Sequence, residues 1–588
     1  MNDARTYPGR AIVLLSLLLA MAQAQAVSLV VTTTADPAVG TDDCTPPSGN
    51  AVVCVSLRGA ITRALASVDV TSTITLAPLD GQTILLSQFS NDLGCVTSNS
   101  VSCTSGTLGA EFGASAFFIT RGKALTIDAT ASGAVHGVTI ARCTDSAACY
   151  GNGPVPNFRL FDVARGNALT LRGLSLKNGF ALGGNAVNGG GALGAGGAIF
   201  NQGQLFIDRC TLTSNSAQGG DAVAYMFGNL DRTGGGGAGQ PGQTVNQSDN
   251  ANGGGPNGGL GGVKSNSGGG SGADGSLGGG GGAGGTGVGS NGGQGGGGGF
   301  GGGGGPGGDG LYDTTHPVDG GNGGFGGFGG GGGGQGYPFF TDGPGASSFG
   351  GGVGSNDGTA STGGSGAGMG GAIFNDAGSV AVTNSTFAGN SASGGANALA
   401  SSTDSAGYGG ALFNYNGSMT LDFVTLSGNT AAAGTGGTGG SADGGAVYSL
   451  GDSPASCSAG GNPCATSAAS LTMLNTIAAN NNVGTNDVAT NAINGGGNAS
   501  DGGGNLITTN AGFGGTVVST ADPQLGALIP GGGIESVMIP KIGSPAIDTG
   551  ACDATTVDQR GDPRPWQQTP CDIGAVETND RIFRNGFE

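Results

Sequence analysis

The sequence predicts an all-β protein, a parallel β-helix (solenoid) with a long glycine-rich insertion and a C-terminal cap. The first observation is composition, since 135 of the 588 residues are glycine and only 10% are charged, unlike an ordinary globular domain. The second is an internal repeat whose copies each contain a short alternating apolar run. The third is that one copy cannot bury its own apolar face, so the copies must stack. Helical bundles and nucleotide-binding α/β enzymes are disfavoured by the scarcity of helix-forming residues.

Each copy of the repeat has two elements with a strand-like run between them. The first element is a Gly-Gly-Ala motif, at Gly196, Gly370, Gly409 and Gly444. The second element reads Thr-apolar-x-x-Asn, from Thr211 to Asn215, Thr386 to Asn390, Thr425 to Asn429 and Thr476 to Asn480. The runs are Leu205/Ile207, Val380/Val382, Met419/Leu421 and Leu471/Met473. Such alternation is typical of a half-buried strand, and stacking at about 4.8 Å would align the inward residues of successive repeats.

The asparagines of both elements suit the sharp corners of a coil, because asparagine tolerates a left-handed backbone. Two ladders are expected, in which each amide bonds to the next. They are Asn201, Asn375 and Asn414, and Asn215, Asn390, Asn429 and Asn480. The alternative is that these residues are solvated turn positions without a ladder.

The N-terminus predicts an exported protein. Arg5 and Arg10 precede the apolar run 11–20, and Ala24-Gln25-Ala26 provides a small-x-small cleavage pattern. The run is shorter than the roughly 20 residues that span a bilayer, so a cleaved signal peptide is expected and a membrane anchor is not. The expected organisation is a signal peptide over 1–26, β-helix over 27–218, glycine-rich insertion over 219–368, β-helix over 369–520, a cap over 521–577 and a tail motif over 578–588.

Ten of the eleven cysteines lie in close sequence pairs, among Pro, Gly, Ser and Asn. The candidate disulfides are Cys44/Cys54, Cys95/Cys103, Cys143/Cys149, Cys457/Cys464 and Cys552/Cys571, with Cys210 left over. This spacing predicts local disulfides formed in an oxidising compartment. Metal ligation is disfavoured because there is no Cys-x-x-Cys motif and the two histidines, His136 and His316, are isolated.

Three groups of motifs resemble those of bacterial surface proteins. Gly370–Ile373 together with Phe387–Asn390 resembles the GGAI/FxxN repeat of chlamydial polymorphic outer-membrane proteins. Residues 31–36 and 54–61 resemble the N-terminal region named for its Cys-Ser-Leu-Arg-Glu-Ala signature, although Val55 is inserted and Gly59 replaces Glu. Five motifs within 521–575, in the expected order, resemble those of the choice-of-anchor Q domain. Residues 580–588 resemble a terminal motif of secreted proteobacterial proteins. The resemblances imply a right-handed parallel β-helix, secreted or held at the outer membrane.

The C-terminal segment 521–577 is expected to cover the open end of the solenoid, where strand edges would otherwise be exposed. Five charged residues are expected to form buried ion pairs that organise this cap, and a catalytic role is disfavoured for them. They are Asp548, Asp558, Arg560, Arg564 and Asp572.

The insertion, nearly half glycine, has too few apolar residues for an ordinary core. Two states are compatible with its composition, a flexible loop or glycine runs packed as polyproline-II strands. Gly269–Asp274 matches the GGxGxD calcium motif once. Chance accounts for a single match in so glycine-rich a segment, so neither calcium nor another cofactor is expected.

The net charge of −19 disfavours nucleic acid and anionic membranes as partners. Asp208 and Asp422 hold equivalent outward positions, and with Thr383 between them they would lie roughly 9–10 Å apart, near the separation in inverting glycosidases. No neighbour is expected to raise the pKa of either carboxyl, so a solvated acidic face is favoured over catalysis by this pair. A polysaccharide lyase or glycoside hydrolase is the alternative function. The leading hypothesis is a non-catalytic adhesion or interaction scaffold that contacts extracellular glycans or protein surfaces, with no catalytic, cofactor or metal site.

Overall fold

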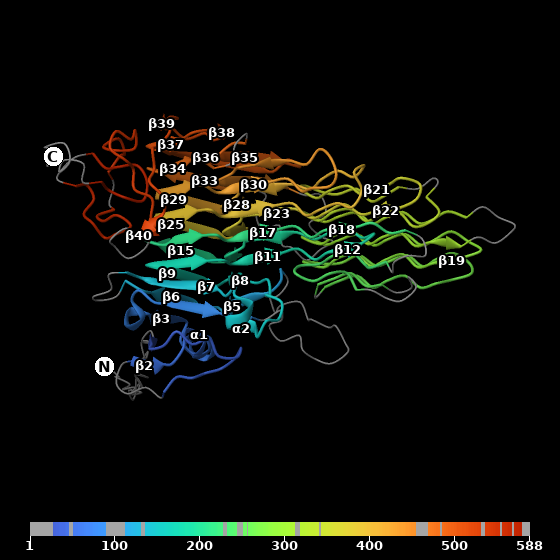
Figure 1. The fold of residues 1–588 in the computed structure, drawn as a ribbon, viewed down its shortest axis with the longest axis horizontal. Helices are drawn as coiled ribbons and strands as arrows, with labels where there is room; N and C mark the ends of the chain where they lie inside the picture. Colours follow the sequence, from blue (N-terminus) through green and yellow to red (C-terminus); the bar gives the residue numbers. More distant parts are fainter. Residues whose placement is uncertain are drawn as a thin grey trace, which may run out of the picture.

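The computed structural model is almost entirely β, with 38% of residues in strands and 4% in helices. Its sheets are mostly parallel, and strands of successive repeats lie one above another (Figure 1). The structure describes residues 27–45, 51–89, 112–130, 136–226, 232–243, 251–255, 257–311, 318–339, 343–453, 468–481, 485–530, 536–552, 555–566 and 570–578. The predicted signal peptide and most of the predicted tail therefore lie outside the described residues.

The largest sheet has two rows of strands, and the first row contains one strand, or part of a strand, from each successive repeat. In order of pairing, these are β3 (Thr71–Thr75), β6 (Ala124–Asp128), β9 (Ala168–Arg172), β15 (Gln204–Asp208), β25 (Ser379–Ala388), β29 (Ser418–Ser427), β33 (Ala468–Leu474) and β36 (Gly497–Gly503). Leu205 pairs with Val380, and Val380 pairs with Met419. The predicted register is confirmed, and the arrangement is compatible with a β-solenoid.

A second row of strands continues this sheet after a bend. It contains β4 (Thr83–Leu86), β7 (Val138–Arg142), β10 (Leu174–Lys177), β16 (Thr211–Thr213), the ends of β25 and β29, β34 (Ile477–Ala479), β37 (Asn505–Ile507) and β39 (Val517–Ser519). The bend within β25 falls at Asn384 and that within β29 at Phe423, and both residues have positive φ.

An eight-stranded parallel sheet lies on the opposite side of the core from the largest sheet. Its strands are β5 (Ser115–Ile119), β8 (Arg159–Val163), β14 (Ile199–Asn201), β24 (Ile373–Asp376), β28 (Leu412–Tyr415), β32 (Val447–Asp452), β35 (Val488–Ile493) and β38 (Asn510–Ala511). Between the sheets lies one apolar core that runs through all the repeats, from Leu29 to Ile507. The inward residues of the predicted alternating runs, such as Leu205 and Leu471, are fully buried in it.

Smaller parallel sheets close each repeat. One contains β11 (Phe180–Leu182), β17 (Ser216–Gln218), β26 (Ser391–Ser393) and β30 (Thr430–Ala432), and another contains β13 (Gly194–Ala195), β23 (Gly368–Met369), β27 (Gly407–Tyr408) and β31 (Ala442–Asp443). At the N-terminal end, β1 (Val27–Val31) pairs with both β2 (Ala51–Cys54) and β3. Helix α1 (Leu57–Ala66) follows, and the Ser56 side chain accepts a bond from the Gly59 amide to cap it.

Both asparagine ladders are present, and one member differs from the prediction. The Asn201 amide donates to Asn375 at 2.7 Å, and Asn375 donates to Asn414 at 2.8 Å. In the second ladder Asn215 donates to Asn390, and Asn390 donates to Asn429, each at 2.9 Å. The next acceptor is Asn481 at 2.8 Å, and the predicted Asn480 is instead exposed.

The glycine-rich segment is built from extended chains whose backbones bond to one another. The Gly281 amide donates to the Gly303 carbonyl and the Gly304 amide to the Gly331 carbonyl, each at 2.9 Å. The described residues therefore follow the packed alternative rather than the flexible one. The segment extends away from the stacked sheets (Figure 1). Inside it, Arg232 and Asp309 form a buried ion pair at 3.2 Å.

Aromatic rings join this segment to the stacked sheets. The rings of Phe200 and Phe374 stack 5.4 Å apart, and those of Phe374 and Phe413 stack 5.1 Å apart. Phe328 from the glycine-rich segment lies 4.5 Å from the ring of Tyr415. On the other side in sequence, the Leu193 amide donates to the Gly301 carbonyl at 2.9 Å. The insertion is therefore packed against repeats that precede it and repeats that follow it.

The C-terminal segment does not lie over the end of the stack, as its predicted role as a cap requires, but along its flank. Gln559 donates to the Cys210 carbonyl at 3.0 Å and accepts from the Thr386 hydroxyl at 2.6 Å. The Ala575 amide donates to the Thr425 hydroxyl at 3.0 Å. These threonines lie on successive repeats, so the segment crosses the second strand row and does not continue the stack.

Candidate functional site

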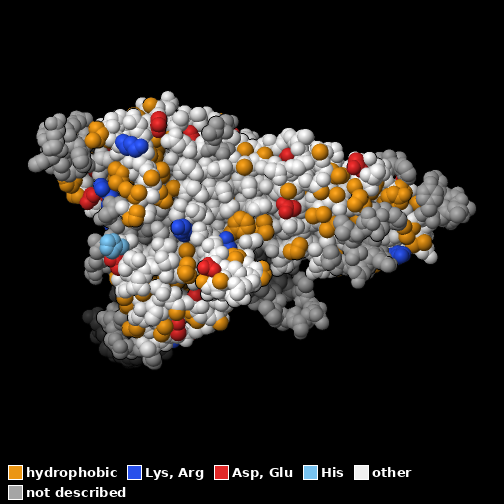
Figure 2. All heavy atoms as spheres, viewed as in Figure 1, with side chains coloured by type: hydrophobic (Ala, Val, Ile, Leu, Met, Phe, Trp, Pro, Cys, Tyr) orange, Lys and Arg blue, Asp and Glu red, His pale blue; other side chains and the backbone are white. Residues whose placement is uncertain are grey.

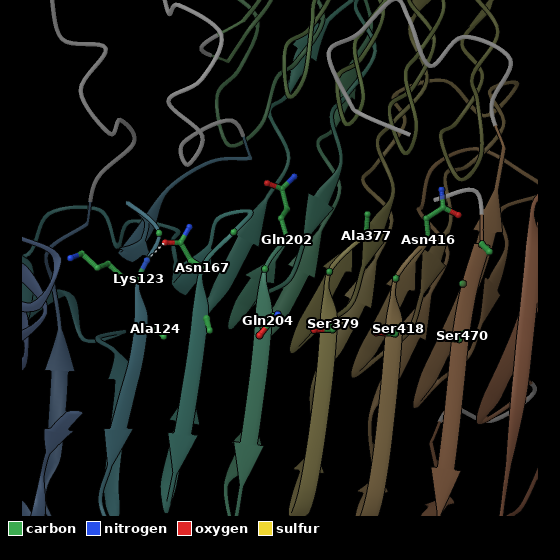
Figure 3. A pocket seen from close by; sticks show the side chains of 18 of the residues that line it. Lys123, Ala124, Asn167, Gln202, Gln204, Ala377, Ser379, Asn416, Ser418 and Ser470 are labelled. Atoms are coloured by element: carbon green, nitrogen blue, oxygen red, sulfur yellow. Dashed lines mark hydrogen bonds between the residues drawn. The ribbon is translucent and has the colours of Figure 1, made fainter. Parts of the chain in front are cut away.

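A groove of about 810 Å³ crosses the starts of successive strands, where the eight-stranded sheet turns into the largest sheet. Figure 3 shows its side chains following one another from strand to strand. We call this feature the groove, and its lining includes Lys123, Asn167, Gln202, Gln204, Ser379, Asn416, Ser418 and Ser470. The remaining lining residues are mainly glycine and alanine, whose small side chains leave the space open.

The polar side chains of the groove differ in how far their own contacts satisfy them. Lys123 lies at one end, and its ammonium donates to the Ser67 and Asp69 carbonyls, each at 2.7 Å. Gln202 donates to the buried Asp376 carboxylate at 2.7 Å. In contrast, Gln204 and Ser418 are exposed. The groove thus presents an uncharged polar edge with groups available to a ligand.

The outward residues of β6, β9, β15, β25, β29 and β33 form a face beside the groove, which we call the outer face. Its middle row reads Thr126, Thr170, Phe206, Ala381, Thr420 and Thr472 in register. Its far row reads Asp128, Arg172, Asp208, Thr383, Asp422 and Leu474. Alternation of Asp and Arg at the start of the far row partly neutralises its charge. Charged side chains are sparse and scattered over the side of the molecule that Figure 2 shows.

Phe206 is the large apolar side chain of the middle row, and 43% of it is exposed. Its neighbours in the stack are Thr170 and Ala381, and along its own strand the outward neighbours are Gln204 and Asp208. The repeat pattern did not single out Phe206, because the repeated apolar positions of this strand are the buried ones, Leu205 and Ile207. The alternation itself could have indicated it, since an aromatic residue at an outward position is unexpected.

The structure places Asp208 and Asp422 as the sequence predicts, with Thr383 paired to both. Burial raises the pKa of the Asp208 carboxyl, and Arg209 and Arg172 oppose this rise. Arg209 lies 3.7 Å from the carboxylate. The expectation that nothing raises either pKa was therefore wrong for Asp208, because part of its side chain is enclosed by its neighbours.

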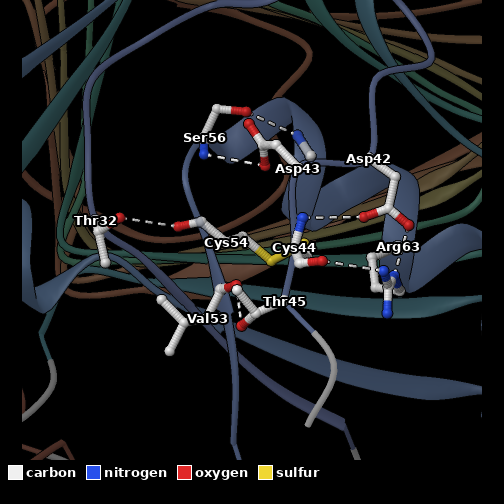
Figure 4. The surroundings of a disulfide bond; sticks show 10 residues. Thr32, Asp42, Asp43, Cys44, Thr45, Val53, Cys54, Ser56 and Arg63 are labelled. Atoms are coloured by element: carbon white, nitrogen blue, oxygen red, sulfur yellow. Dashed lines mark hydrogen bonds and ion pairs between the residues drawn. A yellow bond between two sulfur atoms is a disulfide. The ribbon is translucent and has the colours of Figure 1, made fainter.

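Three of the candidate cysteine pairs form disulfides, namely Cys44–Cys54, Cys143–Cys149 and Cys552–Cys571. Cys95, Cys103, Cys457 and Cys464 lie outside the described residues. Cys210 is buried, and its thiol donates to the Asp208 carbonyl at 3.3 Å. Figure 4 shows the first disulfide beside Arg63, which donates to the Cys44 carbonyl at 3.3 Å and to Asp42 at 2.6 Å. These contacts fasten the disulfide loop to helix α1.

The charged residues predicted to organise the C-terminal segment do so through partly different pairs. Arg560 lies 3.0 Å from Asp558, as expected. Arg564 pairs with Glu577 at 3.2 Å, and its guanidinium lies 3.9 Å from the centre of the Phe423 ring. Burial lowers the pKa of Arg564. The sequence did not indicate Glu577, because the recognisable motifs of the segment end at residue 575.

Asp572 acts as an acceptor within the same segment. Its carboxylate accepts a hydrogen bond from the Asp548 backbone amide at 2.7 Å. The contact between these two residues therefore uses the backbone of Asp548 and not its carboxylate. Burial raises the pKa of the Asp572 carboxyl, and bonds from Thr578 and the Asp548 amide oppose the rise. These residues therefore organise the segment internally, and Arg564 also contacts the stack through the Phe423 ring.

The single calcium-like motif serves a structural contact, since the Asp274 carboxylate accepts the Gly297 amide at 2.6 Å. Within the described ranges, no three His, Cys, Asp or Glu side chains gather in a way that could hold a metal ion. No helix in the same ranges has both the length and the apolar character needed to cross a bilayer.

Comparison with known proteins adds no identity. No protein-family model, no curated protein and no solved structure matches this chain. The groove and the outer face are therefore interpreted from their own chemistry.

Proposed function

We propose that this protein is an exported, non-catalytic interaction scaffold, a right-handed parallel β-helix that binds extracellular glycan or protein surfaces. The observation that carries the proposal is the groove, which crosses successive repeats and is lined, apart from Lys123 at one end, by small and uncharged polar residues. A repeated lining of this kind suits a ligand that is itself extended and repetitive, because each repeat adds an equivalent contact.

Export is supported by the N-terminal signal pattern and by the disulfides, which are typical of proteins that fold in an oxidising compartment. The motif resemblances of the N-terminal and C-terminal regions favour a bacterial secreted or outer-membrane protein. Expression in a Gram-negative host with and without residues 1–26, followed by fractionation, tests export. Retention of the full chain in the cytoplasm would contradict it.

Binding is tested by exposing the purified protein to arrays of extracellular glycans and matrix proteins. The matched variant replaces Ser418 with Trp, which would fill the groove from an exposed position. Binding by the wild type that falls in this variant is expected. Binding that is unchanged when the groove is filled would refute the assignment of the groove as the contact site.

A glycoside hydrolase is the second candidate, because burial raises the pKa of the Asp208 carboxyl and Asp422 lies two strands away. A raised pKa is what a general acid requires. If the protein is a scaffold, incubation with polysaccharides releases no reducing ends. Release that disappears in both Asp208→Asn and Asp422→Asn, while the variants stay folded, would establish the enzyme instead.

A further inference from the structure

We propose that the outer face and the groove together bind a neutral polysaccharide, and that Phe206 is the platform on which one pyranose ring stacks. This inference rests on the proposed function and names its ligand class. It is carried by one juxtaposition, an aromatic ring exposed on a polar sheet face directly beside a groove with uncharged polar edges.

The surroundings of Phe206 match the two chemical faces of a sugar. A pyranose ring presents apolar C–H bonds on its flat side and hydroxyl groups around its rim. The Phe206 ring offers an apolar surface of similar size, and aromatic rings supply binding energy at little conformational cost. Gln204 and Asp208, the outward neighbours along β15, place an amide on one side of the ring and a carboxylate on the other.

The small neighbours of Phe206 keep the ring accessible along the stack. Thr170 and Ala381 occupy the equivalent positions on β9 and β25. Neither side chain is long enough to cover an aromatic ring on the next strand, about 4.8 Å away. A chain of sugars can therefore pass over the ring from one strand to the next.

The groove provides the continuation of this path. Gln204 belongs to both features, since it lines the groove and precedes Phe206 on the same side of β15. Ser379, Ser418 and Ser470 hold the equivalent position on the following strands. Hydroxyl and amide groups repeated at the strand spacing can each bond to one hydroxyl of a successive sugar.

The charges favour a neutral ligand. Among the groove residues Lys123 alone is charged, and the Ser67 and Asp69 carbonyls already accept its ammonium protons. The net charge of −19 repels polyanions at long range. Asp128 and Asp208 flank Arg172 in the far row, so this row offers no uniformly positive surface to uronate or sulfate groups.

The same features argue against a protein as the occupant. Protein interfaces of standard size bury about 800 Å² on each partner around an apolar, aromatic-rich centre. Phe206 is the one aromatic side chain of the outer face in the strands β6 to β33, and its neighbours are threonines, alanine and polar residues. One ring surrounded by hydrogen-bonding groups suits a sugar better.

The experiment measures binding of the full-length protein to soluble neutral polysaccharides by affinity electrophoresis and calorimetry. The probes are dextran, a β-1,3-glucan and galactomannan, with polygalacturonate as the anionic comparison. Phe206→Ala is expected to lower affinity for the bound neutral polymer at least tenfold. Phe325→Ala is the matched control, because Phe325 is 69% exposed in the glycine-rich segment, and it should bind as the wild type does.

A second variant separates loss of the platform from loss of folding. Phe206→Trp keeps an aromatic platform, so it should retain affinity, and its new indole should change emission when an oligosaccharide of the bound polymer is added. Unchanged affinity in Phe206→Ala, or no emission change in Phe206→Trp at saturating ligand, would overturn the platform. Preference for polygalacturonate, or binding to arrayed proteins only, would refute a neutral polysaccharide as the ligand. Either result would still agree with the proposed scaffold function.

Discussion

Removal of the Asn390 side chain tests whether the asparagine ladder supports the stack of repeats. Asn390 is 1% exposed and links three repeats. Its carboxamide oxygen accepts from the Asn215 backbone amide at 3.1 Å and from the Asn215 side chain at 2.9 Å. Its own amide donates to the Leu212 carbonyl and to Asn429, each at 2.9 Å. Asn390→Ala therefore leaves two buried donors of Asn215 without this acceptor.

The expected cost follows from those two donors. One buried donor without a partner costs about 1–3 kcal/mol, so the loss of the acceptor for two donors should lower the unfolding free energy by about 2–6 kcal/mol. Urea denaturation followed by far-UV circular dichroism measures the shift of the midpoint. Asn481→Ala should behave in the same way, because Asn481 accepts from Asn429 at 2.8 Å.

The matched control is the neighbouring asparagine outside the ladder. Asn480 is exposed and has a φ of 59°, so Asn480→Gly keeps a tolerated backbone and should change stability by no more than about 0.5 kcal/mol. Equal midpoints for Asn390→Ala and Asn480→Gly would refute the reasoning, since the ladder would then contribute nothing beyond a surface turn.

Three further variants test other parts of the molecule. Phe328→Ala removes a ring 4.8 Å from Phe300 and should destabilise the glycine-rich segment by about 3–5 kcal/mol, which thermolysin cleavage within the segment would report. The double variant Cys552→Ser/Cys571→Ser opens a loop with a sequence separation of 19 and should lower stability by about 3 kcal/mol, measured by thermal unfolding without reductant. Asp376→Asn tests a buried carboxyl whose pKa is raised by burial. The folded state keeps this proton after the unfolded state has released it near pH 4, so wild-type stability falls as pH rises. The advantage of the variant in thermal midpoint should therefore grow from pH 4 upward.

Each of these variants has a control in the same chain. Phe325→Ala removes an exposed ring and should leave thermolysin resistance unchanged. Cys143→Ser/Cys149→Ser opens a shorter loop, with a sequence separation of 6, and should cost less than the C-terminal pair. Asp501→Asn makes the same substitution at an exposed carboxylate, and it should change stability by no more than about 0.5 kcal/mol. A reversal in any pair would contradict the corresponding assignment.

The repeat spacing was sufficient to predict the strand register and most of both ladders. The error at Asn480 comes from the alignment of the fourth copy. The sequence motif aligns Thr476 with Thr425 of the third copy, whereas in the structure Ile477 pairs with Thr425. The inward residues Leu471 and Met473 already indicated this offset, because their pairing with Met419 and Leu421 places the ladder one residue further along.

The position of the C-terminal segment could not be predicted from local patterns. Its contacts are hydrogen bonds from Gln559 to Thr211 at 2.9 Å and from the Ala575 amide to Thr425. Outward threonines on a strand look the same in the sequence whether water or another segment covers them. The groove could not be predicted for a similar reason, because its space comes from glycine and alanine at the strand starts. The packing of the glycine-rich segment could not be predicted either, because this segment has no periodic pattern of side chains.

The backbone packing of the glycine-rich segment has a consequence for how this protein can vary. A Cβ atom on Gly303 would collide with the Gly190 carbonyl, one on Gly331 with the Gly364 carbonyl, and one on Gly302 with the Gly279 carbonyl. Even alanine is therefore forbidden at these positions without displacing a neighbouring chain. At most of the described glycines in this segment no side chain fits, so random mutagenesis should find these positions among the least tolerant of the polypeptide.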